Sequence, residues 1–161
     1  MSDMSGDAIP ADDIEAEIAL RLGAIPKPVD WRHLDAHAAA DEWAALDEWV
    51  RWLVQRYELD GRELPPCWHQ HGPLVEELSS LRGAHLVAFD PAQAASAAAD
   101  WHRTLWDSRI RVRDAVSRSG CTERSHNDVS APTWIAPSGT YAARLAQTVR
   151  ADALNRTWIP A

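Results

Sequence analysis

Apolar residues recur every three or four positions along three stretches of the chain, which is the spacing of one face of an α-helix. The clearest stretch carries Trp43, Leu46, Val50, Leu53 and Tyr57. These stripes predict helices near residues 38–58, 73–89 and 95–119. The sequence holds no convincing alternating pattern of the kind that β-strands show, so we predict an all-α fold with three principal helices.

Glycine and proline mark where these helices should begin and end. Asp60-Gly61 stops the first helix, and Pro73 suits the first position of the second, where a missing N–H costs nothing. Asp90-Pro91-Ala92-Gln93 has the order of a capping box, so we expect Asp90 to cap the third helix. Gly120 is a natural stop for that helix.

We predict that the chain has three parts: an N-terminal arm, a helical core domain and a C-terminal segment. Residues 1–29 form an acidic arm with a short helix around Ile14 to Leu22, and residues 30–126 form the helical core domain. Residues 127–161 form a loop and a C-terminal helix, from about Gly139 to Leu154, which packs on the core or extends from it.

The charge distribution argues against a general polyanion-binding protein. The 161-residue chain has a formal net charge of −8. Residues 1–60 hold 14 acidic and 5 basic residues, and residues 61–161 hold 10 acidic and 11 basic residues. Neither an apolar stretch of membrane-spanning length nor a signal-peptide pattern is present. We therefore predict a cytoplasmic protein without a membrane partner, whose two cysteines are thiols.

The segment Pro65-Pro66-Cys67-Trp68-His69-Gln70-His71-Gly72-Pro73 is the part of the chain that most resembles a chemical site. Together with a second pair downstream it offers five candidate zinc ligands: Cys67, His69, His71, Cys121 and His126. The Cys-x-His-x-His run lacks the usual pair of closely spaced cysteines, so we predict a corner between two helices, anchored by a buried Trp68, without a cofactor. A zinc site is the alternative, and it requires the loop after the third helix to fold back beside this corner.

A cluster of arginines gives a second candidate site. The cluster has a local net charge of +3 over 22 residues, which suits phosphate contacts on a helix face. It comprises Arg103, Arg109, Arg111, Arg113, Arg118 and Arg124. Solvation of this face, or pairing with acidic residues of the first long helix, explains the same pattern. Nucleic-acid binding is therefore the alternative and not our main prediction.

Nine tryptophans are more than so small a core can place at its centre. Trp49, Trp52 and Trp106 are the candidates for an exposed aromatic surface, because tryptophan is enriched at binding hot spots. The sequence contains no nucleophile elbow, phosphate loop or dinucleotide fingerprint. We therefore predict no catalytic residues and a non-enzymatic interaction module that binds another protein or itself.

Four segments in a fixed order carry a family resemblance. They are Glu48-Trp49-Val50-Arg51-Trp52-Leu53, Leu64 through His71, Leu74 to Leu81, and Asp100-Trp101-His102 with Trp106. Over about residues 40–126 the chain resembles an uncharacterised family of small, Trp-rich helical proteins of actinobacteria. Genes of that family often lie near plasmid-transfer or phage genes, so the resemblance implies an accessory role in a mobile genetic element. It implies no activity.

Overall fold

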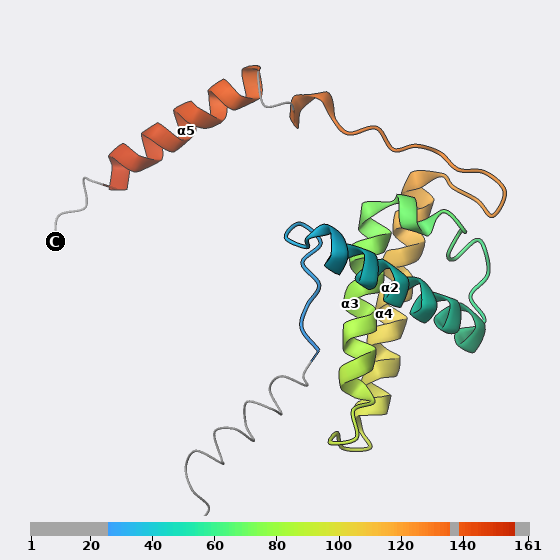
Figure 1. The fold of residues 1–161 in the computed structure, drawn as a ribbon. Helices are drawn as coiled ribbons and strands as arrows, with labels where there is room; N and C mark the ends of the chain where they lie inside the picture. The colour runs from blue at the N-terminus through green and yellow to red at the C-terminus, as the bar shows by residue number, and fades with distance from the viewer. Residues whose placement is uncertain (1–25, 136–138, 157–161) are drawn as a thin grey trace, which may run out of the picture. The chain divides into compact units, whose positions relative to one another are not determined.

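The computed structural model describes residues 26–135 and 139–156, and these form helices and loops without a β-strand (Figure 1). Their order is α2 (Ala36–Tyr57), the 3₁₀ turn η1 (Trp68–Gln70), α3 (Gly72–Ala88), α4 (Ala97–Ser119), the 3₁₀ turn η2 (Thr133–Ile135) and α5 (Thr140–Arg156). The predicted all-α class is confirmed for this part of the chain. The short helix expected around Ile14 to Leu22 lies outside the described residues.

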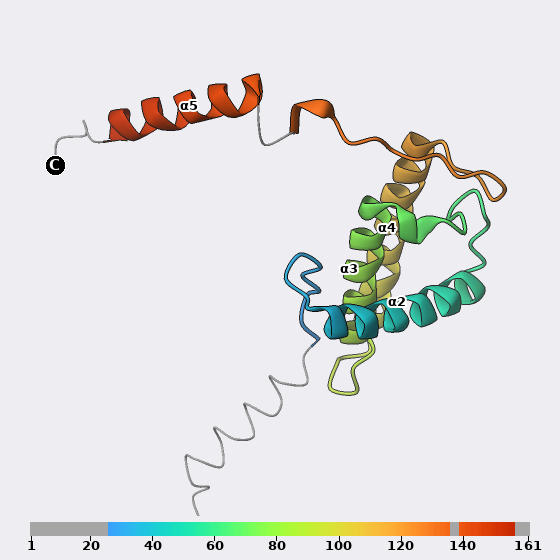
Figure 2. The ribbon, with the colours of Figure 1, turned by 45° about the horizontal axis from the view of Figure 1, so that its top comes forward.

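The chain divides into two compact units, the first ending at Asn127 and the second beginning at Asp128. In the first unit α3 and α4 run antiparallel side by side, and α2 crosses them steeply (Figures 1 and 2). The start of α3 and the end of α4 consequently lie at the same end of this pair. None of the helices in the described ranges is long and apolar enough to cross a membrane.

The core of the first unit fills the space between α2, α3 and α4. Its most completely buried apolar side chains are Leu46, Leu53, Leu74, Leu78 and Trp101. The indole N–H of Trp101 donates a hydrogen bond to the hydroxyl of Tyr57 across 2.7 Å. This bond satisfies a polar group that would otherwise be costly to bury between α2 and α4.

Local hydrogen bonds explain where these helices begin and end. The Asp35 carboxylate caps α2 by accepting from the backbone N–H groups of His37 and Ala38. The expected cap of α4 at Asp90 is wrong, because that carboxylate accepts from the N–H of Ala92 and closes a separate turn. The helix itself begins at Ala97, seven residues after Asp90, and Ser96 is its N-cap residue.

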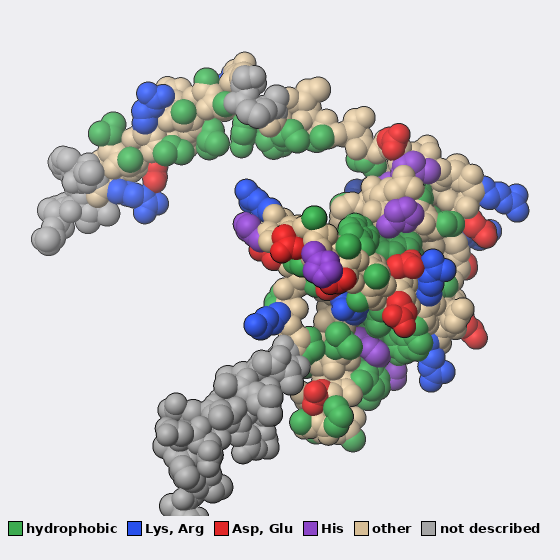
Figure 3. All heavy atoms as spheres, in the orientation of Figure 1, with side chains coloured by type: hydrophobic (Ala, Val, Ile, Leu, Met, Phe, Trp, Pro, Cys, Tyr) green, Lys and Arg blue, Asp and Glu red, His purple; other side chains and the backbone are tan. Residues whose placement is uncertain are grey.

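The second unit consists of η2, α5 and the chain that precedes them. The Trp134 ring packs against the Tyr141 ring in a tilted arrangement, with ring centroids 4.8 Å apart. Hydrophobic side chains line one side of α5 (Figure 3), and among them Tyr141, Leu145 and Val149 recur every four residues and are exposed. The unit therefore presents an amphipathic helix whose apolar side is open in this structure.

Candidate metal centre

The Cys67–His71 segment is a tight corner between α2 and α3, as predicted. Pro65 accepts a hydrogen bond from the N–H of Trp68, and Cys67 accepts one from the N–H of Gln70, which closes the η1 turn. The Trp68 side chain is only 7% exposed, so its predicted role as the buried anchor is confirmed. Because Cys67 and His71 flank this single turn, their side chains reach the same side of the corner.

The loop that follows α4 is folded back by its own hydrogen bonds. Gly120 ends the helix with a φ of 69°, a left-handed conformation that glycine adopts without strain. The Asn127 side-chain amide donates to the Gly120 carbonyl at 2.9 Å, and the N–H of Cys121 donates to the Ser119 hydroxyl at 3.1 Å. These bonds hold Cys121 at the end of α4 and return the chain toward it at Asn127.

The same loop lies against the connection between α2 and α3. A Cβ atom built on Gly61 would come within 2.9 Å of the Glu123 side chain, closer than real Cβ contacts. A side chain at this position would force the Glu123 side chain to shift. The close approach places the loop after α4 beside the corner before α3, as the zinc alternative requires.

Four side chains converge where the corner and the loop meet. They are Cys67 and His71 from the corner and Cys121 and His126 from the loop, and their potential ligand atoms all lie within 4.8 Å of one another. The first three are buried, and His126 is exposed on the outer side. Segments about fifty residues apart in the sequence thus contribute one thiol and one imidazole each.

The separations fit tetrahedral coordination. With Zn–S near 2.3 Å and Zn–N near 2.0 Å, a sulfur and a nitrogen bound to one tetrahedral zinc ion lie about 3.5 Å apart. The His71 Nε2 lies 3.7 Å from the Cys67 Sγ and 3.2 Å from the Cys121 Sγ. The Cys121 Sγ lies 3.7 Å from the His126 Nδ1. These three sulfur–nitrogen separations are close to the value that one tetrahedral ion would impose.

The two thiols differ in their electrostatic surroundings. At Cys121 the backbone N–H of Asn127, 3.2 Å from the sulfur, and a hydrogen bond involving Ser119 lower the pKa of the thiol to about 6. Burial raises the pKa of the Cys67 thiol, and the neighbouring Cys121 raises it further. Cys121 is therefore the more acidic of the two thiols, and a bound dication would favour the thiolate of both.

His69 is the sequence candidate that the structure keeps away from the centre. It lines a groove of about 340 Å³ together with Asp47 and Arg51 on the other side of the corner. His69 lies within the 3₁₀ turn η1 and His71 directly follows it, so two histidines only two positions apart face different surroundings. Of the five candidate ligands, four converge and His69 does not.

The candidate aromatic surface is only partly exposed. The expectation that Trp49 is exposed is wrong, because its side chain is 9% exposed and its indole N–H lies 3.4 Å from the His85 Nδ1. Trp52 is 37% exposed and stacks on the same His85 ring at 4.6 Å. Trp106 is 60% exposed on α4. Trp49 therefore belongs to the core, and Trp52 and Trp106 form part of the exposed surface.

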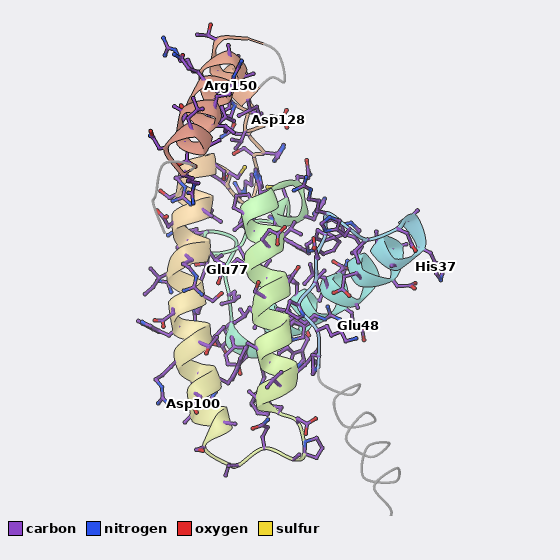
Figure 4. All side chains as sticks on the ribbon, turned by 90° about the vertical axis from the view of Figure 1, so that its left-hand side faces the viewer. His37, Glu48, Glu77, Asp100, Asp128 and Arg150 are labelled. Carbon is purple, nitrogen blue, oxygen red and sulfur yellow. The ribbon has the colours of Figure 1, made fainter. Side chains whose placement is uncertain are left out.

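Five of the six arginines in the cluster lie beside carboxylates. Arg109 and Arg113 both approach the Glu63 carboxylate. Arg111 pairs with Glu77 on the neighbouring α3, and Figure 4 labels Glu77. Arg103 pairs with Asp100, and Arg118 pairs with Asp114. These pairs neutralise most of the positive charge that the sequence suggested, and they favour the structural explanation of the arginine cluster.

Comparison with known proteins identified no relative of this chain. No protein-family model matches the chain, and neither a curated protein nor a solved structure matches it significantly. The resemblance to an actinobacterial family stays a prediction, and functional inference has to start from the metal-ligand geometry.

Proposed function

We propose that this chain is a zinc-binding helical domain in which Cys67, His71, Cys121 and His126 hold one structural Zn²⁺ ion. The observation that carries the proposal is the convergence of two sulfur and two nitrogen atoms within 4.8 Å from two distant segments. A tetrahedral set of two thiolates and two imidazoles is the ligand set of structural zinc. For this proposal, the convergence of the donor atoms outweighs the irregular sequence spacing, which led us to predict a corner without metal.

A structural role fits this ligand set better than a catalytic one. Catalytic zinc keeps one position for water or substrate, whereas four protein donors fill a tetrahedral ion. Three of the four ligands are buried, which limits access to the metal. The ion would crosslink the corner before α3 to the loop after α4, and so would close the end of the helix pair where Gly61 and Glu123 already touch.

For the domain as a whole we propose a non-enzymatic role in protein contacts. Trp106 is 60% exposed, and Ile110, one turn later on α4, is 51% exposed. An exposed aromatic side chain beside an exposed aliphatic one on a rigid helix suits a binding hot spot. An accessory role in a mobile genetic element follows from the resemblance alone.

Elemental analysis of untagged protein tests the zinc proposal. We expect about one zinc per chain in the wild type and loss of zinc in Cys121→Ser and His71→Ala. His69→Ala is the matched control, because this histidine belongs to the same corner but lines a different groove. Equal zinc content in His71→Ala and His69→Ala would contradict the assignment, as would protein that neither contains nor binds zinc.

A further inference from the structure

We propose that Cys67 and Cys121 form a reversible disulfide that replaces the metal ion as the crosslink between corner and loop. This inference rests on the proposed zinc site. The protein would respond to an oxidant such as hydrogen peroxide by releasing zinc without releasing the loop. The centre would thus be a redox-sensitive crosslink with two closed forms.

The composition of the chain fixes the pairing. The sequence contains two cysteines, both reduced and buried in this structure, so an intramolecular disulfide has only one pairing available. Their sulfur atoms belong to the group of donors that lie within 4.8 Å of one another. A disulfide needs a sulfur separation of about 2.05 Å, so the thiols must approach by less than about 3 Å.

The origin of the thiols decides what oxidation does to the fold. If both cysteines came from one segment, a disulfide would form within that segment. The second segment would be held only by its histidines, and it would detach once the metal was lost. Here the corner supplies Cys67 and the loop supplies Cys121. The disulfide therefore joins the same two segments that the ion joins, and it frees the side chains of His71 and His126.

The chemistry balances with peroxide as the oxidant. One thiolate attacks a peroxide oxygen, the O–O bond breaks, and protonation of the departing oxygen gives water and a sulfenic acid. The second thiolate attacks that sulfur, an S–S bond forms, and the S–O oxygen leaves as a second water after protonation. Two thiolates lose two electrons, peroxide gains them, and two protons are consumed. The exposed side of the centre at His126 gives the oxidant access.

A trypsin cleavage site in the loop can report whether the loop is attached to the corner. Arg124 lies between the two loop ligands, so trypsin can cleave after it when the loop is released from the corner. We expect slow cleavage at Arg124 in the reduced zinc-bound protein and in the oxidised metal-free protein. We expect cleavage at least tenfold faster in the reduced protein after chelation of zinc.

The test treats the full chain with hydrogen peroxide and follows released zinc with a chromogenic chelator, free thiols, and intact mass under non-reducing conditions. We expect one equivalent of zinc to leave as both thiols disappear, with a monomer lighter by two hydrogen atoms. Dithiothreitol and zinc should restore the starting state. His69→Ala should behave like the wild type, and Cys67→Ser should form no intramolecular disulfide.

Several results would overturn the inference. They are disulfides between chains instead of within one chain, oxidation to sulfinic or sulfonic acid, retention of zinc after thiol loss, and fast cleavage at Arg124 in the oxidised protein. Absence of zinc from the reduced protein would overturn the proposed function instead. The disulfide crosslink would then be judged separately, by oxidising the metal-free chain and measuring cleavage at Arg124.

Discussion

The Sγ atom of Cys121 lies 3.2 Å from the Nε2 atom of His71, although fifty positions separate the two residues in the chain. This contact links the loop just after α4 to the N-cap residue of α3. It can form because the two helices are antiparallel and bring these ends together (Figure 2). The stability of this end of the first unit should therefore depend on what joins the two side chains.

Removal of the metal should lower thermal stability. A ligand that binds only the folded chain adds about 2.7 kcal/mol at a hundredfold excess over its Kd, which corresponds to about 10–20 °C in Tm for a domain of this size. We expect a chelator to lower Tm by this amount in the wild type, measured by calorimetry. Cys121→Ser should begin near the lower Tm and respond little to chelator. A chelator effect of the same size in that variant would contradict the prediction.

Two tryptophans on α4 should differ sharply in their contribution to stability. Trp101 is 1% exposed and donates to Tyr57, whereas Trp106, five positions later, is 60% exposed. We expect Trp101→Ala to lower the free energy of unfolding by about 3–5 kcal/mol and Trp106→Ala by less than about 0.5 kcal/mol. Urea denaturation measures both. Similar losses would show that Trp106 packs against part of the protein and is not surface.

Acid should destabilise the aromatic cluster around His85. Burial lowers the pKa of His85 below its ordinary value of 6.5, and its Nδ1 faces the indole N–H of Trp49 as an acceptor. The unfolded chain therefore binds this proton more readily than the folded chain does. The stability from neutral His85 is present above pH 6.5 and is lost progressively as the pH falls below that value.

The variant His85→Gln isolates this effect from the other histidines. Glutamine retains an acceptor for Trp49 but does not titrate in this range. Urea denaturation at several pH values between 5 and 8 should show a smaller loss of stability on acidification in the variant than in the wild type. Parallel curves for the two proteins would show that His85 is not the group responsible.

The ion pair between Arg109 and Glu63 should be more strongly coupled than that between Arg118 and Asp114. The Glu63 side chain is 11% exposed and the Arg109 side chain 26%, whereas both members of the second pair are more than 60% exposed. We expect a coupling energy of about 1–3 kcal/mol for the first pair and less than about 0.5 kcal/mol for the second. Double-mutant cycles measure both, and equal values would contradict the burial argument.

The helices could be predicted from the sequence because their signals are local. A stripe such as Leu46, Val50 and Leu53 has the period of a helix wherever it is placed in the fold. The fold-back of the loop after α4 is different, because it depends on the close approach of Gly61 to Glu123 and on the antiparallel packing of α3 and α4. Neither relationship has a periodic signature in the sequence.

The candidate metal ligands were visible in the sequence, but their grouping in space was not. A pattern search expects two cysteines close together, whereas here Cys67 pairs with His71 and Cys121 with His126. The choice of His71 over His69 depends on a single 3₁₀ turn. The burial of Trp49 could not be predicted, because a wide apolar stripe on a helix does not indicate which edge of the stripe packs against a neighbouring helix.

The position of the last ligand sets the length of chain that leads to α5. His126 is the penultimate residue of the first unit, so a metal ion bound there would anchor the chain immediately before the second unit begins at Asp128. If both crosslinks were absent, the anchored end would retreat to Ser119, where α4 ends. The seven residues 120–126 would then join the linker and extend the maximum span available to α5 by about 25 Å. The metal centre would thereby set how many residues of unanchored chain lie between the end of α4 and the start of the second unit.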